Sequence, residues 1–159
     1  MTTRHYPVLF AGCAIEDLPY AEAVQQRLER HAEVEIWNEG SFVPSGNALQ
    51  SLLASGRRVD FALLIASSLD TLSTRGESWN VMRDNVLFEL GIFLGALGPE
   101  RTFLLINRAL SPHIPTDLGG VTPLTFDSRK LNPQSVVGAA CTDIQKAIST
   151  HGLKGASNV

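Results

Sequence analysis

Apolar residues in this chain fall into two kinds of segment that alternate along it. Short apolar runs typical of β-strands occupy residues 6–12, 34–37, 60–66, 101–107 and 121–126. Between them, apolar residues recur at helical spacing over 16–31, 49–56, 83–98 and 136–148. Ser45 is the predicted N-cap of the second of these helices, which should end near Gly56. The pattern therefore predicts strands joined by helices.

This order predicts a single α/β domain, since 159 residues suffice for one core of ordinary size. Strands that alternate with helices form parallel sheets with right-handed crossovers, so we expect a doubly wound, flavodoxin-like sheet of about five parallel strands flanked by helices. The run at 60–66 should be a central strand, and Pro123 places the last strand at an edge. Residues 67–78 are polar and are predicted to be a loop. The domain should span 1–150, with 151–159 a linker or disordered tail.

The helix at 83–98 carries the strongest candidate for chemistry. Between Val86 and Gly98 the only ionisable residue is Glu89, and apolar residues lie on every side, which predicts an interior helix. A carboxylate there is costly to desolvate, so it either pairs with a cation across a packing interface or lines a pocket. Helical spacing places Asn85 one turn before Glu89 on the same stripe. Gly91 and Gly95 predict a close approach of another backbone.

Further candidates lie where ligands bind to doubly wound sheets, beyond the carboxyl ends of the strands. Gly12 and Cys13 follow the first strand, although a cysteine there is more often a small buried residue than a nucleophile. Trp37 and Phe42 flank the second loop and either stack on a base or cap the core edge. Asp70 follows the third strand.

Arg83 opens the helix that carries Glu89, against the helix dipole, which predicts a carboxylate or phosphate partner for it.

Composition and motif searches exclude several classes of protein. The net charge is -3 with no basic stripe, which argues against nucleic acid as a partner. The two cysteines form no CxxC pair, no signal-like or membrane-spanning run is present, and a cytoplasmic location is expected. The four histidines lack metal-ligand spacing, so we expect neither a metal nor a cofactor. Walker, Rossmann and nucleophile-elbow motifs are absent.

Four stretches together resemble one known family. Residues 83–91, Arg-Asp-Asn-Val-Leu-Phe-Glu-Leu-Gly, are similar to the Arg-x-Asn-Val-x-Phe-Glu-Leu-Gly signature of the predicted nucleotide-binding, TIR-like family of bacterial antiphage defence effectors. Residues 93–101 resemble its Gly-x-Leu-Gly-x-x-Arg motif, residues 114–120 its Ile-Pro-Ser-Asp-Leu-x-Gly motif, and residues 59–62 its third strand. The resemblance covers about 8–127. The loop at 12–14 lacks the family's His and Arg, and 67–70 lacks its Pro.

The resemblance implies a Toll/interleukin-receptor (TIR) fold and cleavage of NAD+ at its nicotinamide-ribose bond, by hydrolysis or cyclisation, with Glu89 as the catalytic residue. It also implies filament-like self-assembly driven by a fused cyclic-nucleotide sensor. Contacts to NAD+ are expected from the remaining candidates at the sheet edge and helix start, namely Gly12, Cys13, Trp37, Phe42, Asp70, Arg83 and Asn85. Two alternatives are a non-catalytic TIR signalling module that binds partners through residues 37–46, and an enzyme similar to nucleoside deoxyribosyltransferases.

One carboxylate is chemically sufficient for this reaction. Nicotinamide carries a positive charge while it is attached to ribose and leaves as a neutral molecule, so no general acid is needed. The carboxylate can bind the ribose hydroxyls and stabilise the oxocarbenium-like transition state. Because a single strong catalytic residue is visible, we expect the isolated domain to be nearly inactive when dilute and to gain activity on assembly.

Overall fold

A parallel β-sheet forms the centre of the molecule. The computed structural model describes residues 5–38, 47–118, 120, 121 and 123–155. In the order β2, β1, β3, β6, β7, the sheet strands are Glu33–Asn38, Val8–Cys13, Phe61–Ala66, Thr102–Asn107 and Leu124–Phe126. All the pairings are parallel. The predicted doubly wound sheet of about five parallel strands is confirmed, with β3 at its centre and β7 at an edge.

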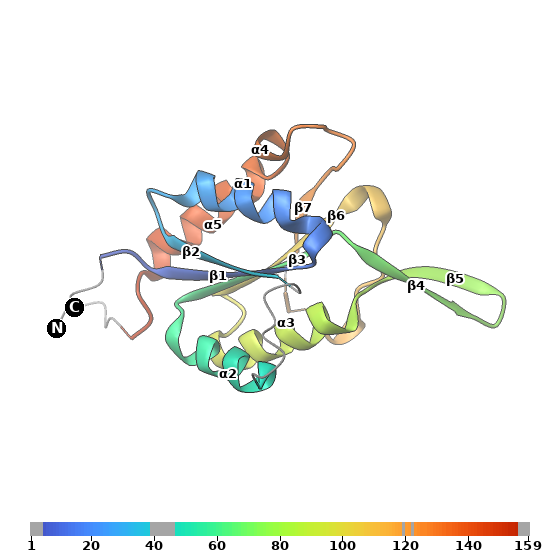
Figure 1. The fold of residues 1–159 in the computed structure, drawn as a ribbon, viewed down its shortest axis with the longest axis horizontal. Helices are drawn as coiled ribbons and strands as arrows, with labels where there is room; N and C mark the ends of the chain where they lie inside the picture. Colours follow the sequence, from blue (N-terminus) through green and yellow to red (C-terminus); the bar gives the residue numbers. More distant parts are fainter. Residues whose placement is uncertain (1–4, 39–46, 119, 122, 156–159) are drawn as a thin grey trace.

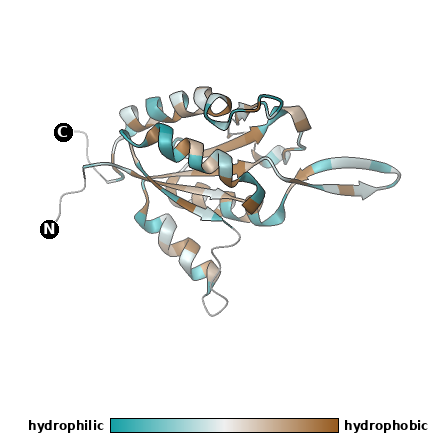
Figure 2. Cartoon of the chain, turned by 45° about the horizontal axis from the view of Figure 1, so that its top comes forward, coloured by the Kyte–Doolittle hydropathy of each residue, from teal (hydrophilic) through white to brown (hydrophobic). Residues whose placement is uncertain are grey.

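Helices cover both faces of the sheet (Figure 1). On one side lie α1 (Leu18–Leu28), α4 (Pro133–Val136) and α5 (Gly138–His151), and on the other lie α2 (Ala48–Arg58) and α3 (Asp84–Leu97). Each side has its own apolar core, and successive residues of a strand enter alternate cores. Figure 2 shows the sheet strands as the most continuously hydrophobic part of the chain.

Three predicted helix boundaries need correction. The helix expected at 16–31 is a 3-10 turn, Ile15–Asp17, followed by α1, which has Pro19 in its first turn. The N-cap of α2 is Asn47, whose side chain accepts a hydrogen bond from the N–H of Gln50 at 3.4 Å, whereas Ser45 lies outside the described residues. The closing helix begins earlier, as α4, and is interrupted before α5.

The segment expected to be a polar loop is instead mostly a β-hairpin. Strands β4 (Leu69–Thr74) and β5 (Glu77–Met82) pair antiparallel and extend away from the domain (Figure 1). Arg75 and Gly76 form its two-residue loop with φ angles of 51° and 80°, the positive values that tight hairpin turns require. Because the segment alternates apolar and polar residues weakly, its strand character was hidden in a mainly polar composition.

Helix α3 has one buried side and one open side. Val86, Glu89, Leu90 and Phe93 are buried, whereas Phe88 is 55% exposed. A Cβ atom placed on Gly91 or Gly95 would meet no atom within 4 Å apart from the backbone of α3 itself. The predictions of a wholly interior helix and of a close backbone approach at the two glycines are therefore wrong, because α3 packs on the sheet from one side only.

The described part of the C-terminal segment is held against the domain. The buried carboxylate of Asp60 accepts the N–H of Val8 at 2.8 Å and the N–H of Lys154 at 2.6 Å. Arg101 donates to the carbonyl oxygens of His151 at 2.7 Å and Gly152 at 2.8 Å. His151, Gly152 and Lys154 are thus hydrogen-bonded to the domain, while 156–159 lie outside the described residues and the division of the chain at residue 150 stays a prediction.

Candidate functional site

The candidate site lies at the carboxyl ends of the three neighbouring strands β2, β1 and β3. Gly12 of β1 is in register with Trp37 of β2 on one side and with Leu64 of β3 on the other. The three residues therefore form a row across the sheet, close to the edge at which doubly wound folds bind ligands. The glycine in the middle leaves bare backbone between two large side chains.

Glu89 fills the space above that glycine. Its side chain projects from α3, the residue is 9% exposed, and its Oε2 would lie 2.9 Å from a Cβ atom placed on Gly12. The same Cβ would lie 2.8 Å from Cδ1 of Leu64 and 2.9 Å from Cε1 of Phe10. Since real Cβ atoms essentially never come within 3.0 Å of another atom, the carboxylate occupies room that only glycine leaves. Gly12 and Glu89, both predicted from the sequence, are thus brought together.

Aromatic rings form the floor beneath this carboxylate. The ring centroid of Phe10 lies 4.3 Å from that of Phe93 and 6.1 Å from that of Trp37, with tilted planes in both pairs. Phe10 and Phe93 are fully buried, and Trp37 is partly exposed at the end of β2. Trp37 therefore packs on the core edge and also borders the site, so both readings of this residue fit its position. Sequence reasoning did not single out Phe10.

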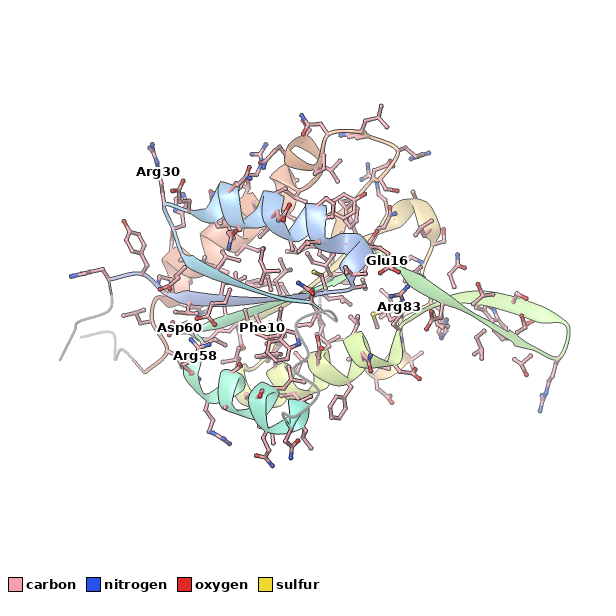
Figure 3. All side chains as sticks on the ribbon, in the orientation of Figure 1. Phe10, Glu16, Arg30, Arg58, Asp60 and Arg83 are labelled. Carbon is pink, nitrogen blue, oxygen red and sulfur yellow. The ribbon has the colours of Figure 1, made fainter. Side chains whose placement is uncertain are left out.

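Arg83 joins two segments at the edge of the site. Its guanidinium donates to both carboxylate oxygens of Glu16, at 3.3 and 3.1 Å, and its Nε lies 3.6 Å from Oδ1 of Asp70 (Figure 3). The hydrogen bond from Arg83 lowers the pKa of Glu16. The partner of Arg83 is therefore a carboxylate, as predicted. The residue connects the 3-10 turn after β1 to the start of β4 in the hairpin.

A buried carboxylate near the site, Asp17, was missed by the sequence reasoning. Asp17 is 2% exposed and accepts hydrogen bonds from the N–H groups of Ser67 and Ser68 at 3.2 and 3.0 Å and from the Ser68 hydroxyl at 3.0 Å. Burial raises the pKa of Asp17, although the hydrogen bonds oppose that effect. Asp17 thus anchors the end of β3 to the turn after β1. Its position directly before a helix was the available signal.

The structure does not bring the remaining predicted residues to Glu89. Cys13 is buried in the core beneath α1 and α5, on the sheet face opposite to α3, so its side chain points away from the site. Asp70 is exposed on strand β4 of the hairpin, and Asn85 is exposed on the first turn of α3. Phe42 lies outside the described residues.

Neither a metal site nor a membrane span is found within the described residues. They contain no group of three or more His, Cys, Asp or Glu side chains arranged to hold a metal ion. Among the same residues, no helix combines the length and the apolar character needed to cross a bilayer.

Comparison with known proteins identifies the class. Residues 9–128 match the family described as CAP12/Pycsar effector protein, TIR domain, and the chain belongs to this family.

Two relatives illustrate the similarity. The chain is 39% identical over 149 residues to the Pycsar effector protein PaPycTIR of Pseudomonas aeruginosa, and 36% identical over 146 residues to the CD-NTase-associated protein 12 of Sphingobacterium faecium. Each match covers 92% of this chain but only 48% and 43% of the respective relative, so the chain spans less than half the length of these proteins.

A solved structure supports the fold independently. The crystal structure of a diflavin flavoprotein A3 from Nostoc sp. superimposes with a TM-score of 0.57, covering 93% of this chain and 97% of that one. At 14% sequence identity the likeness concerns the flavodoxin-like fold and nothing more.

Proposed function

We propose that the chain cleaves the bond between nicotinamide and ribose in NAD+, with Glu89 as its catalytic residue. The observation that carries this proposal is the placement of a mostly buried carboxylate over the bare backbone of Gly12, at the sheet edge where this fold binds ligands. Membership of the TIR effector family supports the same assignment.

The chemistry requires little beyond that carboxylate. In NAD+ the nicotinamide nitrogen carries a positive charge, and breaking its bond to C1′ of the ribose returns the bonding electrons to the ring. Nicotinamide leaves neutral, while positive charge develops on the ribose as an oxocarbenium-like species. Water adds at C1′ and loses a proton, giving ADP-ribose. A fixed carboxylate stabilises the developing charge, and more strongly where water is excluded.

The neighbouring residues have separate roles in this proposal. Gly12 allows the ribose to approach both the strand backbone and Glu89. The buried rings of Phe10 and Phe93 exclude water from the core side of the Glu89 carboxylate. The partly exposed ring of Trp37 offers a surface on which a ring of the substrate can stack. Because Arg83 is engaged by Glu16 and Asp70, its role is to hold the edge of the site in shape.

Assembly is the second part of the proposal. We expect contacts between copies to favour the competent form of the site, so that activity rises with self-association. In longer relatives a further segment is present, and a sensor for a cyclic nucleotide there would couple the signal to assembly. NAD+ depletion in antiphage defence would then follow from activation.

The test is NAD+ turnover across a wide range of protein concentration, with and without a crowding agent. Wild type should release nicotinamide and gain specific activity steeply with concentration, and Glu89→Gln should be inactive because it keeps the shape but removes the charge. Glu100→Gln, a change at an exposed glutamate just beyond α3, is the matched control and should retain activity.

The alternatives give different results in the same assay. A signalling module would show no turnover at any concentration, and a deoxyribosyltransferase-like enzyme would release bases from deoxynucleosides while leaving NAD+ intact. Full activity of Glu89→Gln would remove Glu89 from the mechanism.

A further inference from the structure

The β4–β5 hairpin contacts the site described above through Asp70, at its base, and the rest of it extends from the domain (Figure 1). Figures 1 and 2 show it extending from the domain as a two-stranded ribbon. Two-stranded ribbons are only marginally stable in water unless something packs against them or pairs with their edges. The two edges of this hairpin are therefore informative.

The outer edge of β5 is occupied by another part of the chain. The carbonyl oxygen of Asn80 accepts the N–H of His113 at 2.7 Å, and the Asn80 side chain donates to the carbonyl oxygen of Leu110 at 2.8 Å. Val81 and His113 form a parallel β-bridge. Segment 110–113 thus covers the base of this edge.

The outer edge of β4 is open in the part of the chain that the structure describes. Antiparallel pairs alternate between those that exchange hydrogen bonds and those whose backbone groups point outward. Thr71 is in register with Asn80, whose carbonyl points outward to His113, so Thr71 also presents its backbone groups to the outside. By the same alternation Leu69 and Ser73 do so. No described backbone group bonds to these three residues on that side.

One face of the hairpin is apolar at its middle. Leu72 and Trp79 are cross-strand partners and are 51% and 39% exposed. On the same face, Asp70 is paired with Val81 and Thr74 with Glu77. An open edge beside exposed apolar side chains is the combination that recruits a further strand.

We propose that β4 pairs antiparallel with β4 of a second copy of this chain, around a two-fold axis that passes between the two Leu72 residues. In this register Thr71 of each copy faces Ser73 of the other, and these pairs exchange the outward-pointing backbone hydrogen bonds. The two hairpins become one four-stranded sheet, and the Leu72 and Trp79 side chains of both copies form a continuous apolar stripe on one face.

Charge favours this occupant and this register. Asp70 lies opposite Thr74 of the other copy, directly beside Arg75 in its hairpin loop, so the two-fold axis places two acid–base pairs across the contact. Both residues are exposed, and Asp70 also lies 3.6 Å from Nε of Arg83 in its own copy. The neighbouring register, centred on Thr71, would instead set Asp70 opposite Leu72 and bring a carboxylate against an apolar side chain. An isologous contact of this kind closes on itself as a dimer.

Disulfide capture tests the register directly. Three single variants of the 159-residue chain, Leu72→Cys, Thr71→Cys and Ser73→Cys, are oxidised under mild conditions, and covalent dimer is measured on non-reducing gels. The native Cys13 and Cys141 are buried, which keeps the background low. Leu72→Cys should form dimer at least tenfold faster than the other two. Only residue 72 lies opposite its own copy across the axis, and it does so in a non-hydrogen-bonded pair, whose Cα atoms are close enough for a disulfide. Equal rates for the three variants, or fastest capture through Thr71→Cys, overturn the proposal.

Sedimentation equilibrium tests the contact without cysteines. The wild-type chain should increase in average mass from 17.2 kDa towards twice that value as concentration rises. Leu72→Lys should stay monomeric, whereas Leu131→Lys should associate like wild type, since Leu131 is 97% exposed and lies outside the hairpin. A wild-type chain that remains monomeric throughout, or equal disruption by Leu131→Lys, refutes the pairing. Neither measurement depends on the proposed NAD+ cleavage.

Discussion

Replacing Gly12 by Ala probes the central contact of the proposed site. The added methyl group would lie 2.9 Å from Oε2 of Glu89, whereas ordinary contacts begin at 3.4 Å, so the carboxylate must retreat by about 0.5 Å (3.4 − 2.9) unless the strand moves. The same methyl group would lie 2.8 Å from Cδ1 of Leu64 and 2.9 Å from Cε1 of Phe10, so these side chains must shift as well. The variant therefore displaces the carboxylate that we propose to be catalytic, without removing it.

The expected effects on stability and on activity differ in size. Overpacking a core costs about 1–3 kcal/mol, and the lost flexibility of the unfolded chain offsets roughly 0.4–1 kcal/mol of that. A net loss of about 1–2 kcal/mol leaves a domain of ordinary stability folded. Turnover of NAD+, by contrast, should fall by about tenfold to a hundredfold, because catalysis depends on sub-ångström placement of the carboxylate.

Gly91→Ala is the matched control, two residues after Glu89 on the same helix. Its Cβ meets no atom within 4 Å, and Ala is favoured over Gly in a helix by about 1 kcal/mol. Urea unfolding should show this variant to be more stable than wild type, with unchanged turnover. Wild-type turnover in Gly12→Ala would refute the reasoning, since the position of the Glu89 carboxylate would then not limit catalysis. An equal loss of turnover in Gly12→Ala and Gly91→Ala would mean that turnover responds to any change in the packing of α3 and does not report on the contact between Gly12 and Glu89.

Two further predictions concern the carboxylates around the site. Arg83→Ala should lower turnover by about tenfold, Glu16→Gln by no more than that, and the double variant by no more than Arg83→Ala alone, because Arg83→Ala already removes the contact with Glu16 as well as the one with Asp70; a loss in Arg83→Ala much larger than about tenfold would indicate a direct bond to substrate. Because burial raises the pKa of Asp17, its contribution to the free energy of unfolding should fall as pH rises from the ordinary aspartate pKa, near 4, through that raised value, so wild type should lose stability relative to Asp17→Asn over this range in urea titrations; identical pH profiles of the two proteins would contradict the assignment.

The strands of the sheet, and the burial of the central one, could be predicted from local pattern, because a continuous apolar run such as 61–66 is stable only as a strand covered on both faces. The hairpin could not be predicted as easily. Its turn is Arg-Gly instead of the stronger Asn-Gly signal, and its apolar residues are few and exposed. The contacts of the segment, rather than its composition, decide its structure.

The candidate site was predictable in kind but not in detail. An acid isolated in an apolar helix marks Glu89, yet its contact with Gly12 depends on how α3 crosses β1, 77 residues earlier in the chain (89 − 12). The alternation of a strand places Gly12 and Cys13 on opposite faces, but which face α3 covers is a tertiary property. Asp17 likewise became recognisable only through the Ser67 and Ser68 N–H groups that satisfy it.

The junction between the hairpin and α3 connects the two proposals physically. Strand β5 ends at Met82 and α3 begins at Asp84, so Arg83 alone separates the ribbon from the helix that carries Glu89. Met82 is buried and Arg83 is paired with Glu16 in the 3-10 turn after β1, so both sides of this junction are held against the domain. Asp70 contacts Arg83 within one copy and would lie beside Arg75 of a second copy. A pairing of hairpins would therefore act, through Asp70, on the Arg83 guanidinium that shapes the edge of the site. Because Arg83 directly precedes α3, assembly would in this way be connected to the helix that carries Glu89.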